Sequence, residues 1–253
     1  MYPVIKIGII SIYTYTLAGL LGILFGIIIA VYADSKEKPI RSDIFYCTLY
    51  CVIGGLIGGK TLYLLTIIPI LIQNPELIIN ALSSGMVFYG GLIGGILGGY
   101  VYVRQYKQDF LRLADNIIVG IPVGHFFGRL GCFAAGCCYG KPYDGIFSVV
   151  YPEVSLSAPV GIAVHPVQLY EAFFNLCLFF MLWAVKRKSE VKGMVLAIYL
   201  FSYGIGRFIF ESLRNDTERG FIGLLSTSQF ISIFIILAGI FTLVFTVRRK
   251  QAA

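Results

Sequence analysis

Long apolar runs alternate with short polar clusters along the whole chain, and this alternation is the strongest pattern in the sequence. Each run is about 20 residues long, the length that an α-helix needs to cross the hydrocarbon core of a bilayer. We therefore predict an all-α integral membrane fold with about seven transmembrane helices, forming one polytopic domain over residues 1–253. The predicted spans are Ile9–Tyr32, Ile44–Ile70, Met86–Val103, Leu113–Phe133, Val167–Val185, Met194–Phe210 and Leu225–Val247.

The composition excludes a soluble protein. Only 13% of the residues are charged and 58% are hydrophobic, whereas a soluble domain carries about 25% charged residues. The net charge of +7 could indicate nucleic acid. Basic residues at the ends of apolar spans are, however, typical of contact with an anionic lipid leaflet. We expect membrane lipids as partners and no nucleic acid.

Basic residues are distributed unevenly between alternate loops. Thirteen lie in the first, third and fifth loops and the C-terminal tail, and four lie on the other side. Because cytoplasmic loops are rich in Lys and Arg, we predict an N-terminus outside and a C-terminus in the cytoplasm. The longest connection, residues 134–166, is then an extracytoplasmic loop region. Since long loops often carry function, we expect chemistry at the outer face of a bacterial cytoplasmic (inner) membrane.

Arg129 is the most informative residue within a predicted span. A charge in lipid is costly and marks a candidate functional site. Gly128 and Gly131 flank it closely, which permits a bound headgroup to approach the backbone. The guanidinium group suits two phosphate oxygens. The alternative is a structural ion pair with Asp115 or Glu171.

A polar stripe follows one face of the sixth predicted span. Tyr203, Arg207, Glu211 and Arg214 are spaced as successive turns of a helix, so they share a side. Pairing of Glu211 with its arginine neighbours could explain the stripe by itself. In either case the face should line the bundle interior or a water-filled cavity.

Three further groups are candidates for the site. Tyr89, Gly90 and Gly91 begin a glycine-rich segment, although such segments often serve helix packing alone. His125 lies one turn before Arg129 and is either a packed core residue or a base. At the start of the fifth span lie His165, Gln168, Tyr170 and Glu171.

Cys132, Cys137 and Cys138 cluster in the sequence beside the fourth span. They raise the possibility of a metal or redox site. Zinc sites usually show paired cysteines two to four residues apart in two segments, and that spacing is missing here. We therefore predict no metal ion and no cofactor.

Taken together, these motifs resemble the prolipoprotein diacylglyceryl transferase family. Tyr89–Gly95 is similar to the family's H-G-G-L-I-G segment, and Gly128–Gly140 to its signature G-R-x-G-N-F-x-N. His165–Glu171 resembles H-P-x-Q-L-Y-E, and Tyr203–Glu211 resembles Y-G-x-x-R-F-x-x-E. Ile7–Tyr15 and Ser226–Ser232 are similar to the first and last stretches. The motifs occur in the family's order.

This resemblance implies seven helices, phosphatidylglycerol as the donor and the lipobox cysteine of a prolipoprotein signal peptide as the acceptor. It implies a thioether product and release of glycerol phosphate, with Arg129 and Arg207 holding the headgroup phosphate. The chain departs from the pattern at Tyr89, which replaces the family's histidine, and at Cys132, which replaces the signature's first asparagine. Cys137 aligns with an acidic residue in many members.

The predicted site has two parts. We assign catalysis to His125, Arg129, Arg207 and Tyr89. The predicted substrate-binding residues are Gly90, Gly91, Gly128, Gly131, Cys132, His165, Gln168, Tyr170, Glu171, Tyr203 and Glu211. Alternative interpretations are a divergent transferase with another acceptor, a non-catalytic lipid-binding or transport protein, and a thiol-redox membrane protein. The sequence leaves the acceptor, the base and the oligomeric state open.

Overall fold

The computed structural model describes residues 1–253 except 1, 8–9, 34–37, 84, 216–219 and 252–253. The first predicted span begins at Ile9, which lies outside the described residues, as do Lys36 and Arg219 of the basic-residue count. The described chain forms two compact units, residues 34–113 and the remainder. Each unit is described by itself.

Within the described residues, six helices are long and apolar enough to cross a membrane, or up to seven if one bent pair is counted as a span. This confirms the predicted all-α integral membrane fold. Many of their large hydrophobic side chains lie on the outside of the protein, as expected where lipid is the solvent. The orientation of the termini stays a prediction.

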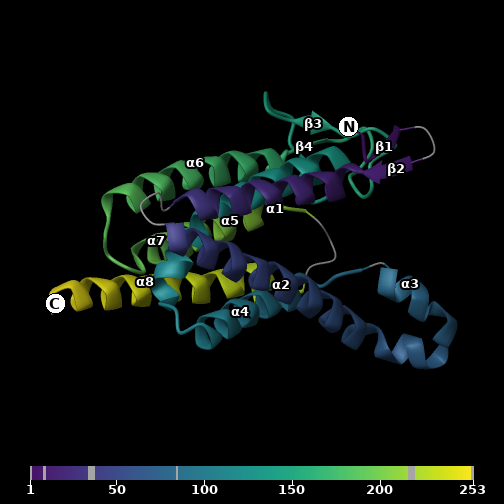
Figure 1. The fold of residues 1–253 in the computed structure, drawn as a ribbon. Coiled ribbons are helices and arrows are strands. Elements are labelled where there is room, and N and C mark those ends of the chain that lie inside the picture. Colours follow the sequence, from purple (N-terminus) through teal and green to yellow (C-terminus); the bar gives the residue numbers. More distant parts are fainter. Residues whose placement is uncertain (1, 8–9, 34–37, 84, 216–219, 252–253) are drawn as a thin grey trace. The chain divides into compact units, whose positions relative to one another are not determined.

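The larger unit contains five of the long helices (Figure 1). They are α1 (Thr14–Ala33), α5 (Phe110–Ala135, whose first turn belongs to the other unit), α6 (Val167–Lys188), α7 (Met194–Leu213) and α8 (Thr227–Gln251). Short hairpins precede α1, α6 and α8. They pair β1 (Val4–Ile7) with β2 (Ile10–Tyr13), β3 (Val149–Val150) with β4 (Ala163–Val164), and β5 (Phe221–Ile222) with β6 (Leu225–Ser226).

The first helix therefore starts later than predicted. Ile10–Tyr13 alternates apolar and polar residues and pairs as a strand with Val4–Ile7, so the helix begins at Thr14. Alternation over four residues beside a long apolar run is hard to separate from the run itself. The predicted start at Ile9 was thus too early by several residues.

The core of this unit joins α5, α6 and α7. Val119, Leu178, Leu182, Val195 and Tyr199 are all buried together. Glycines bring α1 close to α5, because a Cβ at Gly22 would lie only 2.9 Å from the carbonyl oxygen of Gly124. Small residues allow this close approach of helices in lipid.

Asp115, near the N-terminus of α5, caps the start of α7. Its carboxylate accepts hydrogen bonds from the backbone N–H groups of Gly193 at 2.6 Å and Leu196 at 2.9 Å. These N–H groups have no partner within the helix, so the carboxylate acts as a cap. Asp115 is thus committed to α7, which argues against its predicted alternative role as the partner of Arg129.

The smaller unit is a pair of glycine-lined helices. It contains α2 (Lys38–Gln73), the 3-10 turn η1 (Pro75–Leu77), α3 (Ile78–Ser83) and α4 (Phe88–Gln105). Figure 1 shows α2 and α4 side by side. A Cβ at Gly90 would collide with the backbone of Gly58, and one at Gly91 would lie 3.5 Å from the carbonyl oxygen of Gly55. Gly90 thus serves helix packing, the alternative interpretation of this segment, whereas a Cβ at Gly91 would make an ordinary van der Waals contact.

Candidate active site

A charged network connects α5, α6 and α7 inside the larger unit. Glu171 on α6 is at its centre, with a side chain only 6% exposed. One of its oxygens pairs with Nε of Arg129 on α5. The other lies 3.2 Å from Nη1 of Arg207 on α7 and 3.9 Å from Nη1 of Arg214. One carboxylate therefore holds three guanidinium groups in place.

A second carboxylate completes the network. Glu211 Oε2 lies 2.9 Å from Nη2 of Arg207, one helical turn away. The Ser226 hydroxyl donates to Glu211 Oε1 at 3.0 Å, and Arg207 donates to the Ser228 hydroxyl at 3.1 Å. The polar partners of α7 thus come from Ser226 at the end of β6 and from Ser228 in the first turn of α8. Groups this buried are stable only when they are paired in this way.

The network carries one net positive charge. Three arginines stand against two glutamates. The glutamates neutralise most of the charge and fix the guanidinium groups, while the remaining charge matches a singly charged phosphodiester. Arg129 and Arg207 keep 20% and 16% of their side chains exposed. A bound headgroup could therefore reach both without prior unfolding of the network.

The two glycines near Arg129, Gly128 and Gly131, have different surroundings. A Cβ at Gly128 would meet nothing within 4 Å, whereas a Cβ at Gly131 would lie 2.8 Å from the Cβ of Ala18 on α1. Gly131 thus packs two helices together. Gly128 has open space beside it, and its predicted role in the approach of a ligand stays a prediction.

His125 on α5 lies near the arginines of this network. Its ring lies against Tyr203 of α7, with centroids 5.1 Å apart, and Asn175 of α6 and the charges of Arg129 and Arg207 also act on it. Tyr203 in turn stacks on Tyr199. The predicted proximity of His125 to Arg129 is therefore present, in a half-buried position that suits either packing or proton transfer.

Other predicted substrate-binding residues contact the loop of residues 134–166. Gln168 has no exposed surface, and its amide donates to the carbonyl of Cys137 at 2.6 Å and to the Tyr151 hydroxyl at 2.9 Å. The His165 ring stacks on Tyr143 at 3.9 Å and lies 3.4 Å from the Tyr170 hydroxyl. These contacts attach the loop to α6. In this structure their visible role is positioning.

The loop has a small core of its own. Tyr151, Ala158 and Val164 are buried against each other. Burial raises the pKa of Tyr151 to about 12, so this hydroxyl is neutral at physiological pH. The loop also reaches α7, because the Lys141 N–H donates to the carbonyl of Leu213 at 2.8 Å. The loop is therefore folded and contacts the end of α7, and it begins at Gly136 because α5 extends to Ala135.

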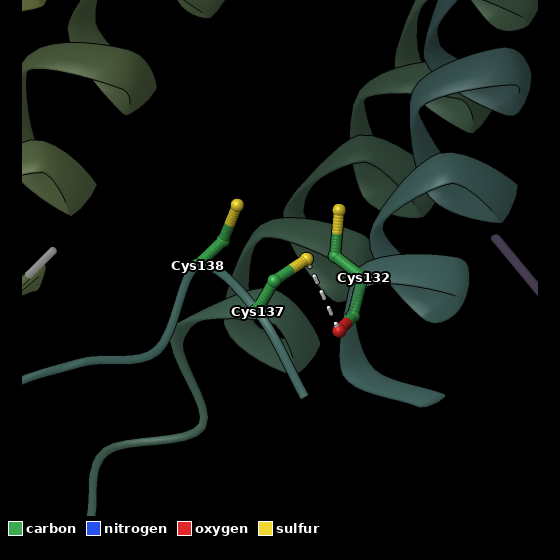
Figure 2. A group of neighbouring side chains, drawn as sticks. All are labelled: Cys132, Cys137 and Cys138. Atoms are coloured by element: carbon green, nitrogen blue, oxygen red, sulfur yellow. Dashed lines mark hydrogen bonds between the residues drawn. The ribbon is translucent and has the colours of Figure 1, made fainter. Parts of the chain in front are cut away.

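Cys132 lies with Cys137 and Cys138 at the junction of α5 and this loop (Figure 2). Hydrogen bonds from Cys132 and Cys137, and then the charges of Arg214 and Arg129, hold the pKa of the Cys138 thiol well below its usual range. The same hydrogen bonding raises the pKa of Cys137. Cys138 is therefore the thiol outside the helix that loses its proton first.

Sequence reasoning missed several members of the site. Arg214 was recognised only as part of a polar face, but it contacts Glu171. Ser226 ends β6 and Ser228 lies in the first turn of α8, where polar residues are ordinary. Tyr15 on α1 interacts electrostatically with Arg129 and the cysteine cluster. The sequence did not single it out, because tyrosines are common near the ends of membrane spans.

Tyr89 is half-buried at the start of α4 and has Phe88 beside it. It belongs to the smaller unit, whereas Arg129 belongs to the larger one. The predicted catalytic role of Tyr89 stays a prediction.

The fold and this network define a polytopic membrane protein with a buried arginine–glutamate site. The family model for prolipoprotein diacylglyceryl transferase matches residues 3–245. The chain therefore belongs to the prolipoprotein diacylglyceryl transferase family.

Relatives of similar length have the same designation. The chain is 41% identical to phosphatidylglycerol–prolipoprotein diacylglyceryl transferase of Clostridium tetani over 243 residues, 96% of each protein. It is 39% identical to transferase 2 of Clostridium perfringens, over 91% of the chain and 90% of that protein. Identity to the Rickettsia bellii transferase is 34%, over 96% and 95%.

Proposed function

We propose that this chain transfers the diacylglyceryl group of phosphatidylglycerol to the thiol of a lipobox cysteine in prolipoproteins. The reaction takes place at the outer face of the bacterial cytoplasmic membrane. The observation that carries this proposal is the network around Glu171, where Arg129, Arg207 and Arg214 meet with one net positive charge. Membership of the family supports the donor and the acceptor.

The chemistry follows from the charges. The acceptor sulfur forms a bond to the glyceryl carbon while the bond from that carbon to the phosphate oxygen breaks. The acceptor proton goes to a base, and glycerol phosphate leaves with an additional negative charge. Guanidinium groups fixed in advance beside this oxygen stabilise the charge as it develops. Arg129 and Arg207 are exposed enough to contact it.

The base is assigned to His125. A thiol with a pKa near 8.5 needs only modest assistance to become the thiolate nucleophile. Tyr89 has the place of the family's histidine, but a phenol hydroxyl is a far weaker proton acceptor than an imidazole ring. His125 lies one turn from Arg129 and against Tyr203, within the layer that contains the arginines.

The direct test uses the purified full-length protein in detergent with phosphatidylglycerol and a synthetic lipobox peptide. We expect release of glycerol phosphate and a matching gain of one diacylglyceryl group in peptide mass. The control is the same peptide with serine in place of cysteine, which should gain nothing. Binding of phosphatidylglycerol without glycerol phosphate release, with any thiol peptide, would instead identify a lipid-binding protein.

A further inference from the structure

Three cysteine thiols converge where α5 meets the outer loop. The sulfur atoms of Cys132, Cys137 and Cys138 all lie within 4.8 Å of one another. Figure 2 shows them directed toward a common space, Cys132 from the helix and the other two from the loop. The three residues are reduced in this structure. The transferase chemistry described above uses none of these thiols.

The backbone is shaped to bring these thiols together. Cys138 has a φ of 61°, a left-handed conformation that is uncommon for a residue with a side chain. Adjacent residues in extended chain direct their side chains to opposite sides, and the left-handed turn at Cys138 departs from that arrangement. A non-glycine residue in this region costs free energy and is often found at functional sites.

The turn is also fixed from both sides. Gly136, with φ of 70°, is left-handed and packs so closely on Ser155 that a Cβ would lie 2.6 Å from the Cβ of Ser155. The Cys137 N–H donates to the carbonyl of Cys132 at 3.1 Å, and buried Gln168 donates to the carbonyl of Cys137 at 2.6 Å. The thiols are therefore arranged before any ligand arrives.

Charge in the surroundings favours thiolates at this position. Arg129 and Arg214 both act electrostatically on Cys138, and Arg129 also on Cys132. Three thiolates around a divalent cation carry one net negative charge, which nearby guanidinium groups stabilise.

We propose that Cys132, Cys137 and Cys138 form a binding site for a thiophilic divalent cation, with Zn²⁺ as the expected ion. Zinc–sulfur bonds of about 2.3 Å in tetrahedral geometry separate sulfur atoms by about 3.8 Å. The widest pair here, at no more than 4.8 Å, needs to contract by about 1 Å at most. Three protein ligands leave the fourth position for water, as in catalytic rather than structural zinc sites.

A zinc site here does not require the two separate pairs of cysteines that are missing from the sequence. Two of the ligands are neighbours and the third lies five residues earlier, and the left-handed turn brings them to one ion. The site does not depend on the transferase activity. It can be tested by metal binding alone.

The first experiment titrates the full-length, freshly reduced protein in detergent with Cd²⁺, a spectroscopic stand-in for Zn²⁺, and follows sulfur-to-metal charge-transfer absorbance. We expect one ion per chain, displaced by Zn²⁺. Cys132→Ser, Cys137→Ser and Cys138→Ser should each weaken metal binding by roughly 100-fold or more. Loss of a residue that only hydrogen-bonds to a metal ligand already lowers metal affinity by about 10–100-fold. Cys47→Ser on α2 and Cys177→Ser on α6 are the matched controls and should bind as the wild type does.

The second experiment needs no variant. Zn²⁺ should protect Cys132, Cys137 and Cys138 of the wild-type protein from alkylation, read by peptide mass, and leave Cys177 as reactive as before. Absence of charge-transfer absorbance in the reduced protein, or equal binding by the three variants, would overturn the proposal. So would a disulfide within the trio together with no metal binding after its reduction, which would identify a redox pair instead.

Discussion

Glu171 lies 3.2 Å from Arg207 through one oxygen and pairs with Arg129 through the other. This carboxylate thus joins the two arginines that are expected to hold a phosphate, and it does so from a third helix. Without it, like charges on α5 and α7 would face each other in a medium where repulsion is strong. Glu171 therefore determines whether the site exists before any substrate arrives.

Replacement of this carboxylate should destabilise the protein. Glu171→Gln removes the carboxylate charge that faces Arg129, Arg207 and Arg214, and breaking a buried pair typically costs about 3–5 kcal/mol. We expect a lower melting temperature in detergent, with transferase activity reduced as well. Glu190→Gln, at an exposed position in the loop before α7, is the control. A Glu171→Gln protein that melts like the wild type would show that the network contributes little to stability.

Loss of the proposed base should lower turnover more than loss of Tyr89. General-base catalysis contributes about 10²–10⁴-fold, so His125→Ala should reduce the rate by that factor. Tyr89→Phe should cost less, because it removes only a hydrogen bond. Rates are compared in one detergent preparation after matched thermal melts. If His125→Ala matches the wild type while His165→Ala is inactive, the base lies on the outer loop.

The cysteine cluster should show an unusual pH dependence. A lowered pKa of Cys138 means that its thiolate persists at pH values below about 8.5, where a free cysteine becomes protonated. In metal-free, reduced protein, carboxymethylation of Cys138 should therefore stay fast as the pH falls, relative to the same residue in the denatured chain. The Cys132→Ser, Cys137→Ser double variant should move the dependence back toward about 8.5. Identical pH profiles for native and denatured protein would contradict the assignment.

The topology prediction is tested by reporter fusions. Fusions after Lys38, Tyr106, Lys188 and Lys250 should report the cytoplasm, because the adjacent loops and the tail carry most of the basic residues. Fusions after Asn74 and Asp144 should report the outer compartment. Two or more reversed sites would refute the predicted orientation.

Much of the fold was predictable because lipid imposes a simple rule. Apolar stretches of about 20 residues must be helices, since an unpaired backbone is not tolerated in a bilayer. The strand at Ile10–Tyr13 and the hairpin that precedes α6 were not predictable. They lie at the ends of the long apolar helices α1 and α6, where the apolar pattern no longer determines the backbone conformation.

The charged residues of the site were predictable because lipid also restricts where charges can lie. Arg129, Glu171 and Arg207 are conspicuous because charge within a span is expensive. The contact of Arg214 with Glu171 was not predicted, because Arg214 follows the last residue of α7. A charge at the end of a span costs little free energy. The convergence of the cysteines was not predictable. The convergence depends on left-handed backbone at Gly136 and Cys138. Cysteine seldom adopts this conformation, so the sequence does not indicate it at Cys138.

The central claim is that Arg129 and Arg207 together hold the phosphate of phosphatidylglycerol. The most direct measurement is turnover and lipid-dependent thermal stabilisation of Arg129→Ala, Arg207→Ala and Arg129→Lys, with exposed Arg248→Ala as the control. A charge-assisted hydrogen bond contributes about 1.5–3 kcal/mol, so each alanine variant should lose about 10- to 100-fold in activity together with the stabilisation by lipid. Arg129→Lys should also fail, because an ammonium group cannot make the two-oxygen contact. Wild-type turnover and wild-type lipid stabilisation in both alanine variants would contradict the assignment of the headgroup site.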